Sequence, residues 1–279
     1  MSVVTFWNNS REQTGKTLSM AAISTYMAIQ HNYRILVIGT GYKDDTLKNC
    51  FWHERKIKRN LGMFGPNTNE ALEDGISGLA RIMNSNKISP ESITNYTKII
   101  FKDRLEILQC FRGELADYEA LKHMYPEIIS LANNYYDLVF VDLDNEIEQE
   151  VSDIILSNSN LVVANISQRL SSINRFIEAK KKTPILNSKK SLILIGRYDK
   201  YSKYTIKNIT RYMKERNKVL TIPYNTLFFE ACEEAKVPEL FFNIKSLEND
   251  DRNSIFVTEV KRASENIMYR LQDLASMKL

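Results

Sequence analysis

A short loop near the N-terminus carries the residue types best suited to chemistry, because it ends in Gly15, Lys16 and Thr17. The loop follows an apolar run at residues 3–7 and opens a helical pattern. Glycine lets the backbone approach a ligand closely, N–H groups at a helix start attract phosphate oxygens, lysine adds positive charge, and threonine offers a hydroxyl to Mg²⁺. A lysine in the first helical turn opposes the helix dipole unless an anion binds there, which favours phosphate binding over a plain helix start. The pattern predicts a nucleotide triphosphate site at Ser10, Arg11, Glu12, Gln13, Thr14, Gly15, Lys16, Thr17 and Leu18.

A second chemical feature is the carboxylate that closes the apolar run at residues 136–141. Asp142 would lie at the carboxyl end of a buried strand, which is the sheet edge where ligands bind in open α/β folds. We therefore predict that Asp142 and Thr17 hold Mg²⁺, with Asp142 acting through water. The alternative is that Asp142 caps the next helix or turn. Asp144 could replace or assist it, or could serve the turn alone.

The elements that must position these groups alternate along the chain. Short β-rich runs occur at residues 3–7, 34–38, 105–110, 138–143, 161–166, 191–196 and 219–222. Helical patterns occur at residues 17–31, 117–133, 147–156, 171–182, 203–215, 226–234 and 253–277. Several of the β-rich runs are almost wholly apolar, as expected of strands covered on both faces. The sequence predicts an α/β fold: a doubly wound, mostly parallel, seven-stranded sheet with helices on both faces.

The bulk composition favours one domain over residues 1–279, since 43% of the residues are hydrophobic and no linker or repeat divides the chain. The net charge of +4 neither requires nor excludes a nucleic acid or an anionic membrane as partner. Three scattered cysteines argue against a disulfide framework. With no leader and no membrane-spanning apolar run, we expect a soluble cytoplasmic protein. Residues 42–68, which include a basic stretch at 55–59, read as a surface excursion.

The order of these motifs resembles the ParA/MinD group of deviant Walker ATPases over nearly the whole chain. The resemblance rests on the Lys16 loop, the strand ending at Asp142, a later strand followed by serines, the segment 196–199 and the segment 222–224. It implies a P-loop ATPase that binds ATP and Mg²⁺. Residues 75–90 and 105–108 also resemble the helix, short helix and strand of the pilus-assembly localisation branch of this group. The plasmid-partition branch is the alternative.

The loop departs from the family pattern Lys-Gly-Gly-x-Gly-Lys-Thr at three positions. Arg11 stands in place of the first lysine, and Glu12 and Gln13 replace two glycines. The resemblance implies that this first basic residue reaches the phosphates of a partner protomer in an ATP-bound homodimer, where a guanidinium contacts several oxygens at once. We therefore assign catalytic roles to Lys16, Arg11 and Asp142. The alternative for Arg11 is a solvated side chain beside Glu12.

Base recognition is the next point of departure. In relatives an Asn on the later strand and the backbone near an Ile-Pro pair recognise adenine, and Gly196 occupies that Asn position here. Arg197, Pro223 and Tyr224 remain our candidates for the base pocket. The alternative is that Pro223 only ends a strand and Tyr224 only packs.

The largest departure follows the second strand, where relatives carry Asp-x-Asp and the second Asp orients the attacking water. This chain has Gly39 and Gly41 at those positions. Without the carboxylates water is not aligned from there, so we expect slow ATP hydrolysis. Asp44 and Asp45 could substitute if their loop folds back.

Three classes of function compete. The first is a positioning or partition ATPase whose ATP-bound homodimer exposes a surface for DNA, membrane or a partner protein. The second is a metabolic ATP-dependent enzyme of the same class, and its iron–sulfur form lacks suitably paired cysteines. The third is a binding module that does not hydrolyse nucleotide, as Gly39 and Gly41 allow.

Two segments bear on the partner. The C-terminal pattern at residues 253–277 has mixed charge, so we interpret it as a helix packed on the core and regard membrane association as the weaker alternative. DNA would contact basic residues on the helical pattern at 203–215, although a solvated face is the simpler interpretation. The basic residues concerned are Lys203, Lys207, Arg211, Lys214 and Arg216.

Overall fold

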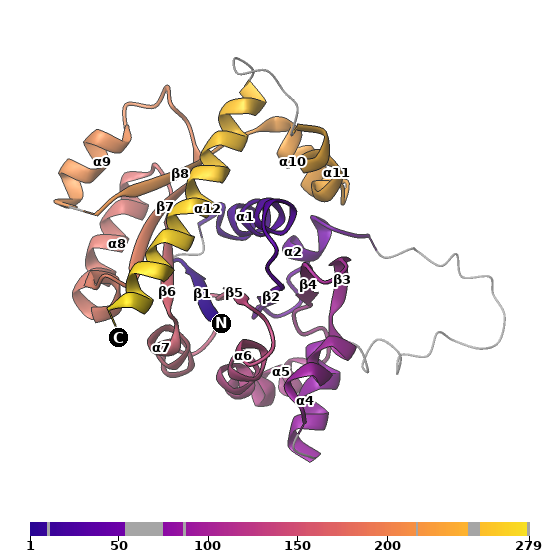
Figure 1. Cartoon of the computed structure of the whole chain (residues 1–279). Coiled ribbons are helices and arrows are strands. Elements are labelled where there is room, and N and C mark those ends of the chain that lie inside the picture. The colour runs from indigo at the N-terminus through magenta and orange to yellow at the C-terminus, as the bar shows by residue number, and fades with distance from the viewer. Residues whose placement is uncertain (10–11, 54–74, 86–87, 216, 245–251, 278–279) are drawn as a thin grey trace.

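A computed structural model describes residues 1–9, 12–53, 75–85, 88–215, 217–244 and 252–277 of the chain. Within these residues eight strands form one sheet in the order β3-β4-β2-β5-β1-β6-β7-β8 (Figure 1). Neighbouring strands are parallel except β3 and β4, which are antiparallel. The strands are β1 (Ser2–Trp7), β2 (Ile35–Gly39), β3 (Lys98–Phe101), β4 (Leu105–Leu108), β5 (Leu138–Asp142), β6 (Leu161–Ile166), β7 (Ser191–Tyr198) and β8 (Val219–Pro223).

Helices cover both faces of the sheet, as Figure 1 shows. One face carries α1 (Lys16–Gln30), α2 (Thr46–Asn49), α10 (Thr226–Glu233), α11 (Val237–Ile244) and α12 (Arg252–Ser276). The other carries α4 (Ile76–Ser85), α5 (Leu115–Leu121), α6 (Tyr125–Asn133), α7 (Gln149–Asn158), α8 (Leu170–Lys182) and α9 (Ile206–Met213). The 3₁₀ helices are η1 (Pro90–Tyr96), η2 (Lys122–Met124) and η3 (Pro184–Asn187). This three-layer arrangement confirms the predicted doubly wound α/β class.

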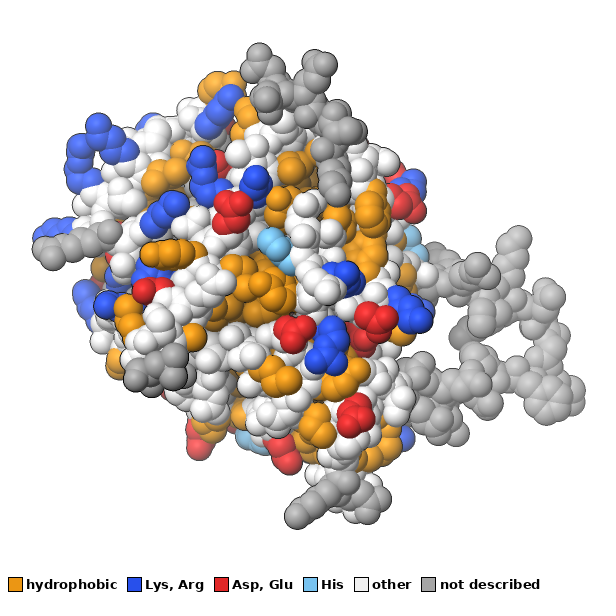
Figure 2. All heavy atoms as spheres, in the orientation of Figure 1, with side chains coloured by type: hydrophobic (Ala, Val, Ile, Leu, Met, Phe, Trp, Pro, Cys, Tyr) orange, Lys and Arg blue, Asp and Glu red, His pale blue; other side chains and the backbone are white. Residues whose placement is uncertain are grey.

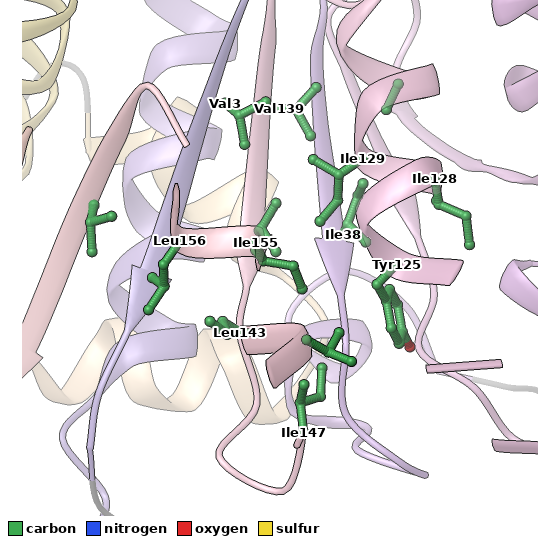
Figure 3. Packing of buried hydrophobic residues seen from close by; sticks show 14 of the residues in the cluster. Val3, Ile38, Tyr125, Ile128, Ile129, Val139, Leu143, Ile147, Ile155 and Leu156 are labelled. Atoms are coloured by element: carbon green, nitrogen blue, oxygen red, sulfur yellow. The ribbon is translucent and has the colours of Figure 1, made fainter. Parts of the chain in front are cut away.

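The core follows from the alternation of side chains along the buried strands. On β5, Leu138 and Phe140 point into the layer of α1 and α12, whereas Val139 and Val141 point into the layer of α6 and α7. Figure 3 shows Val139 in the second layer with Ile129 of α6. Each such side chain contributes about 1.5–3 kcal/mol when fully buried. A strand buried on both faces must therefore be apolar throughout, which explains the continuous hydrophobic runs of the sequence.

Helix α1 is more deeply buried than its amphipathic pattern indicated. It lies between the sheet and helices α11 and α12, so Met20, Ile23 and Met27 are all inaccessible to solvent. The C-terminal helix α12 buries Val260 and Ile267 completely, which confirms the interpretation that it packs on the core. Among the described helices, none has both the length and the apolar character needed to cross a bilayer.

The predicted strand count of seven was one too low within the described residues, because the edge strand β3 was missed. Two of its four residues, Lys98 and Ile99, are exposed, and it pairs with the sheet only through β4. Its apolar run is only three residues long, at 99–101, and none of its residues is fully buried, so the run was too short and too exposed to be recognised as a strand. Asp103, which has a φ of +58°, lies in the turn that leads back into β4.

Three helical regions also differ from the prediction. The helix predicted at residues 117–133 is two helices, α5 and α6, joined by η2, and Pro126 lies in the first turn of α6. Helix α9 is shorter than the pattern at 203–215, because Thr205 caps its start and Lys214 ends it with a φ of +52°. Helix α11 was not predicted separately. The predicted surface excursion at residues 42–68 contains α2, and its residues 54–68 lie outside the described residues. Arg216, one of the basic residues predicted to contact DNA, also lies outside them.

Candidate nucleotide-binding site

The parallel register brings three loops to one edge of the sheet. In the pairing of β1, β2 and β5, Asp142 lies beside Phe6 on one side and beside Gly39 on the other. The loop that ends at Gly15 follows β1, and the segment that contains Gly41 follows β2. All three loops therefore meet at the carboxyl ends of the central strands, where open α/β sheets place their ligands.

Lys16, Thr17 and Asp142 converge at this edge. The Lys16 ammonium lies 2.9 Å from Asp142 Oδ1 and also donates to the Leu143 carbonyl. The Thr17 hydroxyl donates to Asp142 Oδ2 at 2.6 Å. Asp142 is only 6% exposed, and a carboxylate so buried requires a cation and hydrogen-bond donors around it. Helix α1 begins at Lys16 with no acidic residue in its first turn, so positive potential gathers at this point.

The same donor set fits Mg²⁺ delivered with a nucleotide. Mg²⁺ takes few protein ligands, typically one or two side-chain oxygens, and completes its shell with phosphate oxygens and water. The Thr17 hydroxyl and the Asp142 carboxylate are oxygen donors that lie within hydrogen-bond distance of each other. Within the described residues, no group of three or more His, Cys, Asp or Glu side chains is arranged to hold a metal ion. Thr17 and Asp142 are thus the pair that would hold the ion.

The loop backbone is held by close packing against β7. Gly15 has a φ of +77°, and a Cβ there would lie 2.9 Å from Cγ of Arg197. A Cβ at Gly196 would lie 2.2 Å from the Thr14 carbonyl oxygen, which leaves no room for any side chain. Position 196 therefore admits only glycine, because the loop itself occupies the space that a side chain would need.

The two residues that replace loop glycines anchor the loop to its surroundings. Glu12 Oε1 accepts hydrogen bonds from the Ser171 hydroxyl at 3.1 Å and from Arg175 Nη2 at 2.5 Å, both on α8. Gln13 Oε1 accepts from Arg197 Nη1 at 3.0 Å. The sequence offered no signal for Arg175 beyond the unusual acidic residue in the loop. Ser10 and Arg11 lie outside the described residues.

An apolar pocket opens on the β7 and β8 side of the loop. It brings together five residues predicted to contact the nucleotide, and Phe228 and Phe229 of α10 add aromatic surface. The five predicted residues in its lining are Gly15, Leu18, Arg197, Pro223 and Tyr224. Tyr224 is 47% exposed, so its ring offers a face to solvent beside the pocket. The apolar and aromatic character of this lining suits a flat group such as a nucleobase.

A polar pocket lies on the opposite side of the loop, at the ends of β2, β4 and β5. Gly41, Asp44, Asp142, Asp144 and Gln109 contribute to its lining. Burial raises the pKa of Asp144 above its ordinary value, although the backbone N–H of Glu146 and the charge of Lys16 lower it. The structure thus gathers three carboxylates on this side of the loop, where β2 and β5 end.

Asp44 and Asp45 have different surroundings, which separates two residues that the sequence left equivalent. Asp44 lines the polar pocket, so the loop that carries it folds back toward the site. The alternative in which Asp44 or Asp45 substitutes for the missing carboxylates required such a fold. Asp45 forms ion pairs with Arg112 and, at 3.2 Å, with Lys48. Burial raises the pKa of Asp45, but the hydrogen bonds from Arg112 and Lys48 outweigh it and hold that pKa below its ordinary value. Asp45 does not line the pocket within the described residues.

Thr40 ties the two sides of the polar pocket together and was not anticipated. Its hydroxyl donates to the Asp142 carbonyl at 3.0 Å and accepts from the Asp144 backbone N–H at 2.9 Å. The Tyr118 hydroxyl donates to the Thr40 carbonyl at 2.8 Å. Burial raises the pKa of Tyr118 far above its ordinary value, so this donor keeps its proton. The loops after β2 and β5 are therefore rigidly joined.

Comparison with known proteins places this geometry in a wider context. No family model and no curated protein matches the sequence. A ParA family ATPase from Chlorobium tepidum TLS is similar in structure, with a TM-score of 0.66, 12% identity, and coverage of 92% of this chain and 95% of that chain. MinD from Pyrococcus horikoshii OT3, solved with Mg-ADP, gives a TM-score of 0.63, 11% identity, and coverage of 96% and 98%. A Cyanothece McdA variant in complex with ATP gives a TM-score of 0.64, 12% identity, and coverage of 96% of each chain. The chain therefore has the fold of the ParA and MinD P-loop ATPases.

Proposed function

We propose that this chain is an ATP-binding switch of the ParA/MinD kind, a single domain over residues 1–279 that acts in the cytoplasm. The observation that carries the proposal is the convergence of Lys16 and Thr17 on the buried carboxylate of Asp142. This arrangement places a cation, a hydroxyl and a carboxylate beside a glycine loop at a helix start. Few other ligands than a magnesium-bound polyphosphate require all four.

Each residue has a role in this proposal. Lys16 leaves Asp142 to contact the phosphates, since a polyphosphate offers it more negative charge than one carboxylate does. Thr17 and Asp142 hold Mg²⁺. Leu18, Arg197, Pro223 and Tyr224 enclose the base, as their common pocket supports.

Dimerisation is the switching step that we propose. Two copies close around ATP, and Arg11 of each protomer contacts the phosphates held by its partner. The fold shared with ATPases that were solved with Mg-ADP or with ATP supports the choice of nucleotide.

Hydrolysis is proposed to be slow, because Gly39 and Gly41 stand at the two positions where the family pattern carries Asp. The same two glycines favour the second candidate function, a module that dimerises on ATP without turning it over. Multiple-turnover phosphate release at saturating ATP separates the two, since the second candidate releases none above a Lys16→Ala background.

The output of the switch is proposed to be the positioning or partition of DNA or of a cellular complex. Figure 2 shows Lys and Arg side chains gathered over α9 and the adjoining part of α12. Lys203, Lys207, Arg211 and Lys214 are all exposed there, whereas the apolar face of α9 buries Ile209 in the core. Such a surface attracts DNA phosphates or an acidic partner protein, and the binding would weaken steeply with added salt. Membrane attachment through α12 has less support because its apolar face is buried.

Sedimentation velocity tests the switch directly. We expect wild-type protein to shift from monomer to dimer with ATP and Mg²⁺, and to remain monomeric with ADP or with ATP plus EDTA. Lys16→Ala should abolish the shift, whereas Lys189→Ala, an exposed lysine far from the loop, should retain it. A wild-type protein that neither shifts nor gives heat on titration with ATP would contradict the proposal.

A further inference from the structure

The polar pocket holds a carboxylate at the place where the family pattern would put one. A Cβ built on Gly41 would lie 3.1 Å from Asp44 Cβ, 3.3 Å from Asp144 Oδ2 and 3.7 Å from Asp144 Cγ. A side chain at position 41 would therefore project into the volume that the Asp144 carboxylate already occupies. In this chain the carboxyl group reaches that volume from the loop after β5 instead of the loop after β2.

The orientation of Asp144 is fixed at both its backbone and its side chain. Its backbone N–H donates to the Thr40 hydroxyl at 2.9 Å, and its Oδ1 accepts from the Glu146 backbone N–H at 2.7 Å. The second contact is a turn that uses only one carboxylate oxygen. Oδ2 is the oxygen directed toward position 41, which leaves one preorganised acceptor in the pocket.

Other polar groups of the pocket support this assignment. Among the described residues, Gln109 Nε2 is buried without a hydrogen-bond partner, and Gln109 lines the pocket together with Asp144. A buried amide donor without a partner costs about 1–3 kcal/mol, which a water molecule in the pocket would recover. Asp44 is the competing carboxylate and forms the same kind of turn, since its Oδ1 accepts from the Thr46 backbone N–H at 2.8 Å. It approaches position 41 through its Cβ, whereas Asp144 approaches that position through the carboxylate oxygen Oδ2.

We propose that Asp144 is the positioning residue that orients the attacking water for ATP hydrolysis, in place of the carboxylate missing at Gly41. The inference rests on the proposed ATPase function. In the reaction the water oxygen bonds to the γ-phosphorus, and the bond from that phosphorus to the bridging oxygen breaks. ADP keeps the electron pair, and the water proton passes to the departing phosphate or to solvent. Asp144 accepts a hydrogen bond from the water and holds its oxygen toward the phosphorus.

Asp144→Asn tests the role while keeping the size of the side chain and the Oδ1 turn. We expect turnover, measured as phosphate release at saturating ATP and Mg²⁺, to fall by about 100-fold or more, since a side chain positioned on the reacting water contributes about 10²–10⁴-fold. ATP affinity by calorimetry should change by less than about threefold, because the ground-state contacts of the phosphates remain. Asp153→Asn on α7, exposed and outside the pocket, should match wild type in both measurements.

Relocating the carboxylate separates a positioning role from a structural one. Gly41 does not have a positive φ, so an L-residue can adopt its backbone conformation. Its Cβ would lie 3.1 Å from Asp44 Cβ, so Asp44 must shift by a few tenths of an ångström to admit it. Asp144→Ala alone should lose turnover, and the double variant Asp144→Ala with Gly41→Asp should regain at least about tenfold of it. A merely structural loss would not return when the carboxylate moves to the facing loop. The thermal midpoint of each variant checks that it is folded.

The outcomes distinguish this inference from the proposed function. A wild-type protein that does not bind ATP would overturn the function itself. A wild-type protein that binds ATP and dimerises but releases no phosphate would overturn the role of Asp144 and leave the switch intact. Undiminished turnover of Asp144→Asn, or a loss confined to Asp44→Asn, would also overturn it.

Discussion

The polar pocket beside β2 and the apolar pocket beside β8 lie on opposite sides of the Gly15 loop and differ in chemistry. Asp44, Asp142 and Asp144 line the first, which offers acceptors for water and for a metal shell. Tyr224, Phe228 and Phe229 contribute to the second, which offers flat apolar surface. A nucleotide has the same division, since its phosphates and metal are charged and its base is flat and weakly polar.

The difference teaches how this chain keeps a site while changing its residues. On the apolar side the loop itself fills the space of the family Asn, because Thr14 lies directly against Gly196. On the polar side a carboxylate from another loop fills the space beside Gly41. In both places another part of the chain occupies the space beside a glycine that a side chain at that position would otherwise fill.

The largest effect is expected from a variant that displaces the Gly15 loop, which separates the two pockets. Gly196→Ala would push a methyl group to 2.2 Å from the Thr14 carbonyl oxygen, so the loop must move. We expect the free energy of unfolding to fall by about 1–3 kcal/mol and ATP affinity to fall by about tenfold or more. Denaturant titration and calorimetry measure the two effects.

Gly39→Ala is the matched control for that variant. Its methyl group would lie 3.4 Å from Cys110 Cβ, which is ordinary contact, so both quantities should stay near wild type. Wild-type ATP affinity in Gly196→Ala would show that the loop does not depend on this close approach.

Removing the metal-side hydroxyl should affect the polar pocket alone. Thr17→Ala deletes the donor that lies 2.6 Å from Asp142 Oδ2, and we expect ATP affinity in Mg²⁺ to fall by about 5- to 10-fold. In EDTA the variant and wild type should bind ATP equally, since the hydroxyl then has no metal to hold. Ser24→Ala, buried in the same helix but distant from the loop, controls for helix effects. An equal loss in EDTA would argue against a metal role.

Truncating the apolar pocket should give a smaller loss without metal dependence. Tyr224→Ala removes a half-exposed aromatic ring. Stacking of a base on an aromatic ring contributes about 1–3 kcal/mol, and we expect the lower end of that range because the ring is partly exposed to solvent. We expect ATP affinity to fall by about three- to fivefold, by the same factor in Mg²⁺ and in EDTA. Tyr269→Ala on α12, 69% exposed, should leave affinity unchanged. A loss of ATP affinity seen only with Mg²⁺ would show that Tyr224 acts on the metal side of the site and does not contact the base.

The smallest expected effect concerns the thiol in the polar pocket. Burial raises the pKa of Cys110 to about 12, so the thiol is neutral at pH 8 and only about one part in ten thousand is reactive thiolate. The neutral form persists until the pH approaches that value, and iodoacetamide should leave Cys110 unmodified in the native protein at pH 8. Peptide mass spectrometry, with denatured protein as the labelled control, checks this. Rapid native labelling would show that the pocket opens to solvent.

The predictable part of the fold came from runs with strong local character. The apolar strands and the position of Asp142 follow from side-chain periodicity, because a strand covered on both faces must be apolar and must end where polar ligands begin. Partly exposed elements were not predicted. The apolar run of β3 is only three residues long, and Ala235, with a φ of +59°, separates α10 from α11 without a local sequence signal.

For the site, the sequence by itself determined the chemistry that the Gly15 loop offers, since a glycine, a lysine and a threonine before a helix have few other uses together. Only the tertiary structure decided which carboxylates face that loop. Asp44 and Asp45 are adjacent in sequence, yet one lines the pocket and the other pairs with Arg112. Asp144 reaches position 41 because the two residues follow the neighbouring strands β5 and β2. Such juxtapositions depend on the register of separate strands and on the hydrogen bonds of Thr40, which no local pattern encodes.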